Sequence, residues 1–170
     1  MMRLSVRACK LGFKALVMLC CQNEVSLMTN FKILQTDWQT RHMALMAIRE
    51  QVFIVEQHVP IALEWDNADA SATHFLVVNA AGVAIACARV LADGYIGRMA
   101  VVKAYRGLGI GRELLKQAIT FCKEQGFREV RLSAQKHALN FYAQAGFVVC
   151  SVEYLDADIP HYDMRLNLTD

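Results

Sequence analysis

The sequence predicts a single mixed α/β domain built on one central sheet, with an antiparallel meander in the N-terminal part of the sheet and helices on its flanks. Three observations support this prediction. The chain has 170 residues and is 55% hydrophobic, which suits one domain with a sizeable core. Three short β-like runs follow one another between residues 73 and 102. Amphipathic helical patterns precede and follow these runs, and no internal repeat interrupts them.

The first 28 residues differ from the rest of the chain. They carry a formal charge of +3, whereas residues 29–170 carry −1. Their basic start and short apolar run resemble a weak targeting segment, but Lys14 interrupts the run and no small-residue cleavage site follows it. The alternative is an upstream start codon ahead of Met28, which opens a clean strand-then-helix pattern. In both cases we expect an extension over residues 1–28 outside the fold and a domain over residues 29–170.

The domain begins with a strand and a long helix. Residues 31–35 form a short β-like run, and Thr36 or Asp37 can cap a helix over residues 38–56. Apolar side chains recur at helical spacing along that helix. Residues 57–72 contain a proline and a cluster of acids, so we expect a loop or a broken helix there.

The meander and the C-terminal half of the domain follow. Tight turns that end in glycine separate three strands, at residues 73–79, 83–91 and 95–102. A glycine-rich loop then opens an amphipathic helix that Gly126 ends. Because a helix crosses between the third strand and the next one, we expect those two strands to be parallel. The last expected elements are a strand at 128–133, a helix at 137–145 and strands at 147–152 and 163–168.

The stretch from Tyr95 to Leu115 carries the clearest functional signal. It runs from an apolar strand through the loop KAYRGLGIG to the start of a helix. Unpaired backbone N–H groups and the positive end of the helix dipole face outward at such a place, which binds phosphate. Two other phosphate loops do not fit. A Walker A loop needs Lys and Ser or Thr after its last glycine, and a dinucleotide fingerprint needs a third glycine where Arg112 stands.

The loop from Arg106 to Gly111 resembles the R/QxxGxG/A loop of the GNAT acetyltransferase superfamily. The resemblance covers essentially all of residues 29–170 and implies the acyl-CoA N-acyltransferase fold. A second motif, Asn140 to Phe147, is similar to the NxxYxxxGF-type helix end of these enzymes, with a slightly different interval between Asn and Tyr. An ordinary glycine-rich turn would explain the loop alone, but not the spaced pair of motifs.

A narrower resemblance lies upstream and near the C-terminus. The segment REQVFIVEQ from Arg49, the acids after it and the segment DIPH at residues 158–161 look like the ElaA-like branch of GNAT proteins. Acyl-homoserine-lactone synthases share an echo of the same pattern on the same fold. They are a lesser match, because this chain is shorter and has the complete glycine loop.

The resemblance implies acetyl-CoA as the cosubstrate. Backbone N–H groups around Met99 to Val101 would polarise the thioester carbonyl where their strand splays from its neighbour. Tyr142 would hydrogen-bond the sulfur and protonate the thiolate, with reference pKa values of ~10 for a phenol and ~8.5 for a thiol. A core aromatic at Tyr142 and a surface amide at Asn140 are the alternatives. The residues expected to bind the cosubstrate are Met99, Ala100, Val101, Arg106, Gly107, Leu108, Gly109, Ile110, Gly111, Arg112, Asn140 and Tyr142.

A base must also take the proton of the acceptor amine, because an alkylammonium of pKa ~10.4 is only about 0.04% neutral at pH 7. The candidates are Glu56, Glu64, Asp66, His74 and His161. The resemblance places the segments of Glu56 and His161 beside the acceptor cleft, so we prefer these two as catalytic residues. Each candidate has a plainer explanation, as a solvated acid or as a histidine that satisfies a turn.

The other acceptor contacts are expected from the acidic segment and the strand before the loop. Arg98 can either point into the acceptor cleft and pair with a substrate carboxylate or lie on the surface. The residues assigned to substrate binding are Arg98, Glu64, Asp66 and His74. Acids in this segment indicate a cationic acceptor, but only weakly.

Composition limits the other functions. A nearly neutral domain gives no electrostatic reason to bind nucleic acid, and outside the first 28 residues no segment approaches the ~20 apolar residues of a membrane span. The cysteines show neither CxxC spacing nor a His/Cys cluster, so we expect no metal and no disulfide framework. Cys87, Cys122 and Cys150 lie in apolar runs and are expected to be reduced core residues of a cytoplasmic protein.

The sequence therefore leads to one main hypothesis and two alternatives. The main hypothesis is a cytoplasmic N-acetyltransferase that moves acetyl from acetyl-CoA to a primary amine of a small molecule or peptide. Transfer is expected to be direct, in a ternary complex, because no cysteine stands in a motif that would activate it as an acyl carrier. The alternatives are an acyltransferase like the acyl-homoserine-lactone synthases and a non-catalytic CoA-binding sensor module. A homodimer is left open.

Overall fold

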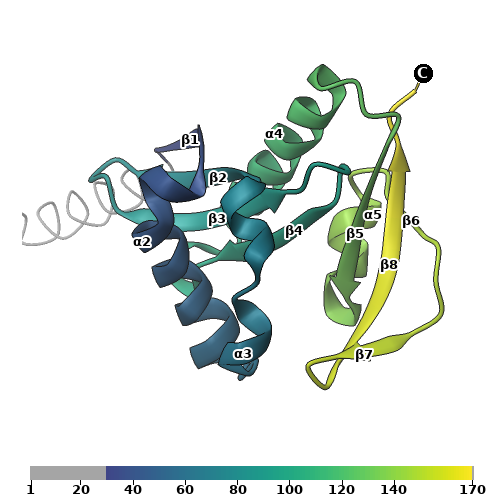
Figure 1. The fold of residues 1–170 in the computed structure, drawn as a ribbon, viewed down its shortest axis with the longest axis horizontal. Helices are drawn as coiled ribbons and strands as arrows, with labels where there is room; N and C mark the ends of the chain where they lie inside the picture. Colours follow the sequence, from purple (N-terminus) through teal and green to yellow (C-terminus); the bar gives the residue numbers. More distant parts are fainter. Residues whose placement is uncertain (1–29, 170) are drawn as a thin grey trace, which may run out of the picture.

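The computed structural model of the protein describes residues 30–169. The extension expected over residues 1–28 lies outside the described residues. The elements run in the order β1 (Phe31–Thr36), α2 (Trp38–Arg49), the π-helix η1 (Glu50–Glu56), α3 (Ile61–Glu64), the 3₁₀-helix η2 (Asn67–Ser71), β2 (Thr73–Asn79), β3 (Ala84–Val90), β4 (Ile96–Val101), the 3₁₀-helix η3 (Lys103–Tyr105), α4 (Ile110–Glu124), β5 (Glu129–Gln135), the 3₁₀-helix η4 (Lys136–Ala138), α5 (Leu139–Ala143), β6 (Val148–Val149), β7 (Tyr154–Asp156) and β8 (Ile159–Asn167) (Figure 1).

The strands form two sheets that touch at one point. The predicted three-stranded antiparallel meander is present as β2 to β4, and β1 adds a fourth strand to it. β8 pairs with β5, β6 and β7 in a second sheet, where one central sheet was expected. Within residues 30–169, the parallel contact between the two sheets is a single bridge, from Tyr95 to Arg131. The expected parallel pairing of the strands on either side of α4 is therefore limited to this bridge. Beyond it β4 and β5 diverge (Figure 1).

A β-bulge in β4 accounts for this divergence. The register with β3 shifts between the pair Cys87–Ala100 and the pair Arg89–Gly97. Arg98 lies in the shifted segment and has a left-handed φ of 50°. A bulge adds a residue to one strand and increases its local twist, so β4 turns away from β5 just after the bridge.

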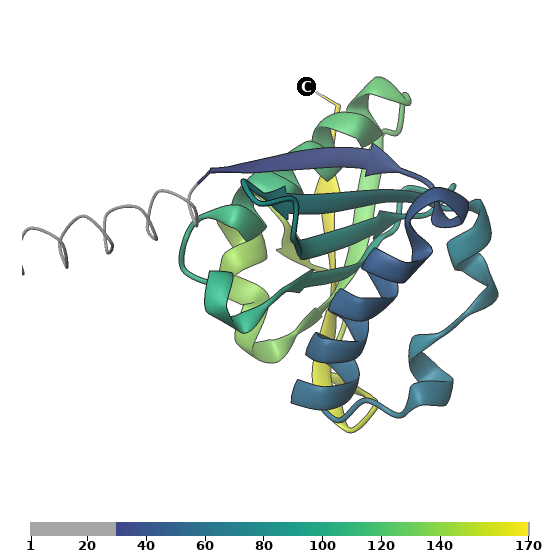
Figure 2. The same cartoon turned by 90° about the vertical axis from the view of Figure 1, so that its left-hand side faces the viewer.

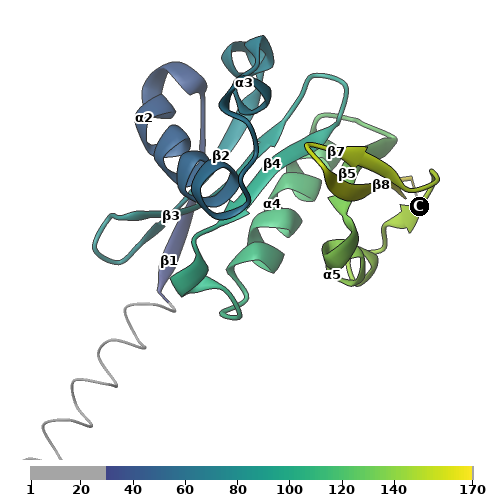
Figure 3. The same ribbon diagram turned by 90° about the horizontal axis from the view of Figure 1, so that it is seen from below.

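Helices α2 and α4 cover opposite faces of the meander (Figures 2 and 3). Leu45 and Ile48 of α2 belong to one buried cluster, together with the side chains of Leu76, Cys87 and Ala100 on the strands. The larger core lies on the other face, where α4 meets both sheets. Its buried members include Leu114, Leu115 and Ala118 from α4, Phe75, Val77, Ala86 and Ala88 from the meander, and Val130, Leu132 and Met164 from the second sheet.

The predicted helix over residues 38–56 is present in two parts, because α2 continues directly into η1. Asp37 caps it, as one of the two expected caps, by accepting a hydrogen bond from the Thr40 N–H at 2.7 Å. The apolar side chains Val52 and Phe53 of η1 lie against the meander. π-Helical turns are often found at functional sites.

The C-terminal prediction needs correction. The strand expected at 147–152 is only the two residues of β6, and the connection expected after it forms β7 and the first part of β8. The turn between these strands consists of Ala157 and Asp158, which both have positive φ, at 50° and 61°. Because alanine rarely adopts this conformation, the sequence carried no turn signal for the β7–β8 hairpin.

The three cysteines of the described residues are free thiols. Cys87 and Cys122 are buried, as expected, and burial raises their pKa values to about 12 and about 11. The expectation is wrong for Cys150, which is exposed because β6 is short. Among residues 30–169, no helix is long and apolar enough to cross a bilayer, and no three potential metal ligands come together.

The buried side chain of Arg49 connects α2, through hydrogen bonds, to the segment that follows η1. Arg49 is 1% exposed and donates through Nη1 to Asp69 Oδ1 at 2.7 Å and through Nη2 to the Glu64 carbonyl oxygen at 2.9 Å. Its Nε donates to the Glu64 carboxylate. The guanidinium also lies 4.8 Å from the ring centroid of Trp65, within cation–π range.

Arg89 and Arg98 connect the same acids to β3 and β4. Arg89 donates to Asp66 Oδ1 at 2.6 Å and to Asp69 Oδ1 at 2.8 Å. Arg98 Nη2 lies 3.2 Å from Asp66 Oδ2. The residues Arg49, Arg89, Arg98, Glu64, Asp66 and Asp69 are called the charge cluster below. Its three arginines face three carboxylates, so its formal charges cancel.

Replacing Arg49 by Met should strongly destabilise the fold. The change leaves the three carboxylates of the charge cluster facing only two arginines, Arg89 and Arg98, so one buried negative charge is uncompensated. Breaking a buried ion pair in this way costs about 3–5 kcal/mol. Urea denaturation followed by circular dichroism measures the loss. The matched control is Arg165→Met, which removes an exposed ion pair to Glu129 and should change the free energy of unfolding by less than about 1 kcal/mol. Equal effects of the two variants would contradict a structural role for the charge cluster.

Candidate active site

The divergence of the two sheets leaves one edge of β4 without a strand partner. The Val102 N–H donates to the Ile85 carbonyl of β3 at 2.9 Å, so Val102 faces the paired edge. Because successive residues of a strand point their backbone groups to opposite edges, Val101 and Met99 face the open edge. The Val101 carbonyl there accepts a hydrogen bond from Arg106 Nε at 2.9 Å. The strand therefore offers backbone N–H groups at Met99 and Val101 to a ligand.

The glycine loop leads from this open edge into α4. Gly107 and Gly109 have φ of 78° and 81°, and Gly109 is the N-cap of α4 without any side-chain cap. A Cβ at either position would meet nothing within 4 Å, so these glycines are required by the left-handed backbone and not by lack of space. The first N–H groups of α4 are thus open to a ligand, beside the positive end of a 15-residue helix.

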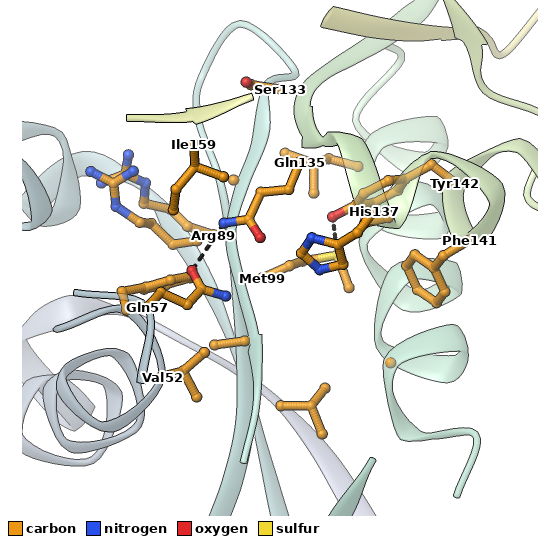
Figure 4. Close-up of a pocket in the computed structure, with 18 of the residues that line it drawn as sticks. Val52, Gln57, Arg89, Met99, Ser133, Gln135, His137, Phe141, Tyr142 and Ile159 are labelled. Atoms are coloured by element: carbon orange, nitrogen blue, oxygen red, sulfur yellow. Dashed lines mark hydrogen bonds between the residues drawn. The ribbon is translucent and has the colours of Figure 1, made fainter. Parts of the chain in front are cut away.

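A cavity of about 680 Å³ joins the loop to the space between β4 and β5 (Figure 4). Most residues predicted for the site line it. They are Glu64, Arg98, Met99, Ala100, Val101, Arg106, Gly107, Gly109, Ile110, Gly111, Arg112, Tyr142 and His161. Five predicted residues do not line it, namely Glu56, Asp66, His74, Leu108 and Asn140.

Tyr142 projects from α5 toward the open edge of β4 (Figure 4). Its hydroxyl lies 4.0 Å from Met99 Sδ, and its ring makes edge contacts with Phe141 and Phe147. Burial raises the pKa of the Tyr142 phenol to about 12, and nearby Tyr95 adds to the rise. The phenol therefore stays protonated at neutral pH and can donate a hydrogen bond into the cavity.

Arg106 spans from the glycine loop to η1. Its Nη1 and Nη2 donate to the two carboxylate oxygens of Glu56 at 2.6 and 2.8 Å. This bidentate hydrogen bonding lowers the pKa of Glu56. A carboxylate held in this way is a weaker base than a free one, which argues against the catalytic assignment of Glu56.

His161 is the histidine that reaches the cavity from β8. It is 8% exposed, and its ring stacks on Tyr154 with 6.1 Å between centroids. Nδ1 lies 2.8 Å from the Ile159 carbonyl oxygen, which can only accept, so Nδ1 carries a proton. In the neutral ring, Nε2 then has a lone pair and can take a proton.

The substrate-binding assignments of Asp66 and His74 are not supported by the structure. Asp66 is held by Arg89 and Arg98, and His74 is 1% exposed with its Nε2 2.9 Å from the Asp69 carbonyl oxygen. Burial lowers the pKa of His74, so the ring is neutral. Glu64 does line the cavity, but its carboxylate is 3% exposed and pairs with Arg49. Glu64 and Asp66, assigned to substrate binding, belong instead to the charge cluster, and the alternative of a solvated acidic face does not hold for the buried Glu64.

Several cavity residues were missing from the sequence prediction. Gln57 and Gln135 meet across the cavity, with Gln135 Nε2 donating to Gln57 Oε1 at 2.9 Å (Figure 4). Ser133 and His137 line the cavity from β5 and η4, and Asp156 from the β7–β8 hairpin. No local motif marks these residues. The alternation along β5, which places Ser133 and Gln135 opposite the buried Leu132 and Ala134, was the one signal that could have found two of them.

The loop end of the cavity fits the phosphates of a CoA thioester. It combines the uncapped start of α4, two left-handed glycines and the guanidinium groups of Arg106 and Arg112. The open edge of β4 fits an amide-containing arm, because it presents backbone donors and acceptors. The other end holds Tyr142, His161 and further polar side chains. Such a fold and site define an acyltransferase with a CoA-type cosubstrate.

The chain belongs to the GNAT acetyltransferase family. The family model described as acetyltransferase (GNAT) domain matches residues 35–168. Protein ElaA of Escherichia coli is 30% identical over 145 residues, covering 75% of this chain and 94% of ElaA. The crystal structure of E. coli ElaA superposes with a TM-score of 0.72 at 29% identity, covering 79% of this chain and 98% of that one. The predicted family and its ElaA-like branch are thereby confirmed.

Two further solved structures are similar to this chain. An acyl-CoA N-acyltransferase from Pseudomonas aeruginosa has a TM-score of 0.72 at 31% identity and covers 80% of this chain and 99% of its own. The CoA-dependent acyl-homoserine lactone synthase BjaI has a TM-score of 0.69 at 17% identity, covering 82% of this chain and 84% of its own. The second likeness is one of fold alone.

Replacing Gly109 by Asp should abolish binding of CoA. The new carboxylate would face the phosphates at the start of α4, and two like charges about 4 Å apart repel by about 4 kcal/mol at an effective dielectric constant of about 20. We expect the Kd for CoA, measured by calorimetry, to rise at least about 100-fold.

The matched control for this variant is Gly82→Asp. Gly82 has a similar left-handed φ, 78° against 81° for Gly109, and open space around it, but it lies in the turn between β2 and β3. Both variants should lose up to about 1–2 kcal/mol of stability from backbone strain. Only Gly109→Asp should lose affinity for CoA, and unchanged affinity in that variant would remove the loop from the cosubstrate site.

Proposed function

We propose that the protein transfers the acetyl group of acetyl-CoA directly to a primary amine of a small molecule or peptide, in a ternary complex. The observation that carries this proposal is the single cavity that connects the glycine loop, the open edge of β4, Tyr142 and His161. A donor arm and an acceptor amine can therefore meet in one space. A cytoplasmic location is part of the proposal, since Cys87 and Cys122 are free thiols.

The backbone of β4 would polarise the acyl carbonyl. The Met99 and Val101 N–H groups face the open edge, and the bulge at Arg98 fixes their direction. Preorganised donors of this kind typically contribute about 3–4 kcal/mol to lowering an acyl-transfer barrier. Because the donors belong to a strand held by β3, they need no reorganisation during the reaction.

His161 is the base that the geometry favours. Of the two preferred candidates, Glu56 is held by Arg106 and does not line the cavity. His161 lines the cavity, and its neutral ring, with the proton on Nδ1, has a lone pair on Nε2. We infer that His161 Nε2 accepts the proton of the acceptor amine, directly or through a water molecule. Glu56 would instead act by holding Arg106 beside the loop.

Tyr142 would stabilise the leaving sulfur as a hydrogen-bond donor. The expected full proton transfer from Tyr142 to the thiolate is unfavourable, because a phenol of pKa about 12 is a much weaker acid than a thiol of reference pKa ~8.5. A hydrogen bond to a charged acceptor needs no such transfer and contributes about 1.5–3 kcal/mol. The proton on the sulfur can then come from solvent.

Direct transfer is favoured over an acyl-enzyme on cysteine. The thiols of Cys87 and Cys122 are buried, with pKa values raised to about 12 and about 11, so neither is a thiolate at neutral pH. None of the three cysteines of residues 30–169, the exposed Cys150 included, lines the cavity. An acyl carrier would need a reactive thiol in that space.

Thiol release from acetyl-CoA across a panel of primary amines tests the function. Release that depends on the amine supports the proposal. Tight CoA binding without release for any amine would favour the sensor module instead. Release only with S-adenosylmethionine as acceptor would favour chemistry like that of the acyl-homoserine-lactone synthases.

Replacing Tyr142 by Phe should lower kcat about 10- to 100-fold and leave the Kd for CoA nearly unchanged. The variant removes one hydrogen bond that forms to the sulfur as its charge develops, worth about 1.5–3 kcal/mol. Since the pKa of Tyr142 is about 12, its ionisation should cause no loss of wild-type rate below about pH 10. Steady-state rates between pH 6 and about pH 10 measure both effects. A variant as fast as the wild type would exclude Tyr142 from the mechanism.

Replacing His161 by Gln should separate the two candidate bases. We expect kcat to fall at least about 100-fold, as for loss of a general base. Glu56→Gln should keep kcat within about twofold and raise the KM for acetyl-CoA no more than about fivefold, because it removes a partly exposed ion pair. Both parameters are read from the same steady-state assay. The opposite ranking of the two variants would return Glu56 to the role of base.

A further inference from the structure

Three residues from three strands form a hydrogen-bonded chain at the wall of the cavity. Ser133 of β5 lines the cavity, and its Oγ lies 2.5 Å from the hydroxyl of Tyr154 on β7. The Tyr154 hydroxyl donates in turn to Asp163 Oδ1 of β8 at 2.7 Å. The mechanism proposed above uses none of these groups. The chain Ser133–Tyr154–Asp163 is called the polar chain below.

The direction of the hydrogens in the polar chain is fixed by its last member. A carboxylate only accepts, so the Tyr154 proton is directed at Asp163. Since Tyr154 has no second proton, Ser133 must donate its own proton to the Tyr154 oxygen. Ser133 Oγ is thereby left as an acceptor. The cavity end of the polar chain presents oxygen lone pairs and no hydrogen.

Tyr95 extends this wall on the side of β4. Burial raises the pKa of its phenol, the charges of Asp163 and Asp156 add to the rise, and hydrogen bonding to Ser133 opposes it. Tyr95, Ser133 and Asp156 all line the cavity.

The charges around this end of the cavity favour a cation. Two carboxylates, Asp156 and Asp163, act on the Tyr95 phenol. Two arginines on the cavity wall, Arg89 and Arg98, are matched by the acids of the charge cluster. The loop end, in contrast, carries Arg112 in addition to Arg106, which Glu56 pairs. The cavity is therefore basic where phosphates would bind and acidic at the opposite wall.

The polar chain is held rigidly. Ser133 and Asp163 are register partners in the pairing of β5 with β8. The Asp163 N–H donates to Ser151 Oγ at 2.8 Å, and its carbonyl accepts from the Cys150 N–H at 2.9 Å. The ring of Tyr154 stacks on His161. A site with fixed acceptors can recognise a donor without reorganising.

We propose that the polar chain binds a positively charged ammonium group of the acceptor through the lone pairs of Ser133 Oγ. The inference rests on the proposed function in taking the acceptor to be an amine, and it adds that the acceptor enters as a cation. An ammonium has three donors and no acceptor, which complements a wall of lone pairs. A hydroxyl-bearing ligand of the same shape gains only one donor and no charge there.

Binding of n-butylammonium, with n-butanol as an uncharged analogue, tests the site without using turnover. The amide signals of Ser133 and Asp163 in ¹H–¹⁵N spectra of the full chain report where each probe binds. We expect both signals to shift with n-butylammonium, with a Kd at least about tenfold lower than for n-butanol. Equal affinity for the two probes, or no shift with n-butylammonium, would overturn the proposal.

Two variants test whether the polar chain binds the ammonium group, and a third serves as a control. Asp163→Asn keeps the shape of the side chain and removes its charge, so n-butylammonium should bind about tenfold more weakly. Tyr154→Phe keeps the ring on His161 but frees the Ser133 proton to point into the cavity, so the preference for ammonium over alcohol should disappear. Asp158→Asn is the matched control, because Asp158 is exposed in the hairpin turn and does not line the cavity; its affinities should equal those of the wild type.

The outcomes separate this inference from the function itself. Wild-type preference for ammonium in both Asp163→Asn and Tyr154→Phe would overturn the polar chain as the site, even if acetyl transfer is observed. Loss of preference in both variants, with unchanged thermal melting and CoA affinity, would support it even if the amine panel yields no turnover. If Asp163→Asn fails to fold, Tyr154→Phe alone decides between these outcomes.

Discussion

The site depends on the loss of pairing between β4 and β5. The two strands share one bridge, at Tyr95 and Arg131, and then separate because the bulge at Arg98 twists β4. A strand edge that is buried without partners is costly, since each unpaired backbone group loses its hydrogen bond to water. The edge is tolerated here because it borders a cavity, and because Arg106 satisfies the Val101 carbonyl. The cavity, its backbone donors and its polar far wall all follow from this one departure from regular pairing.

The charge cluster supports the divergent sheets from behind the cavity wall. Its arginines connect α2, α3 and η2 to β3 and β4, so the position of the bulge is coupled to the segments that cover the cavity. Because the cluster is charge-balanced, each of its acids faces an arginine. This explains why acids that look functional in the sequence have a structural role, whereas His161, one of the two preferred bases, lines the cavity.

The sequence was sufficient wherever the chemistry is local. The glycine loop, the start of α4 and the motif around Tyr142 could be predicted because each is a contiguous stretch whose backbone demands are visible in residue type. The structural role of Glu64, Asp66 and His74 could not be predicted from the sequence, because a solvated acidic loop and an ion-pair network have the same composition. Glu64 is buried against Arg49, which lies 15 residues before it, and Asp66 is paired with Arg89, which lies 23 residues after it. The polar chain is assembled from three separate strands and leaves no contiguous pattern.

The contact between Arg106 and Val101 has a consequence for how ligands are taken up. The Arg106 guanidinium occupies one lone pair of the Val101 carbonyl oxygen and is also anchored by Glu56, so a ligand amide that uses this carbonyl has only the other lone pair. The direction from which a ligand can approach this edge is therefore limited by a side chain of the protein itself. Ionic strength, which weakens the exposed pair of Arg106 and Glu56, would loosen this limit.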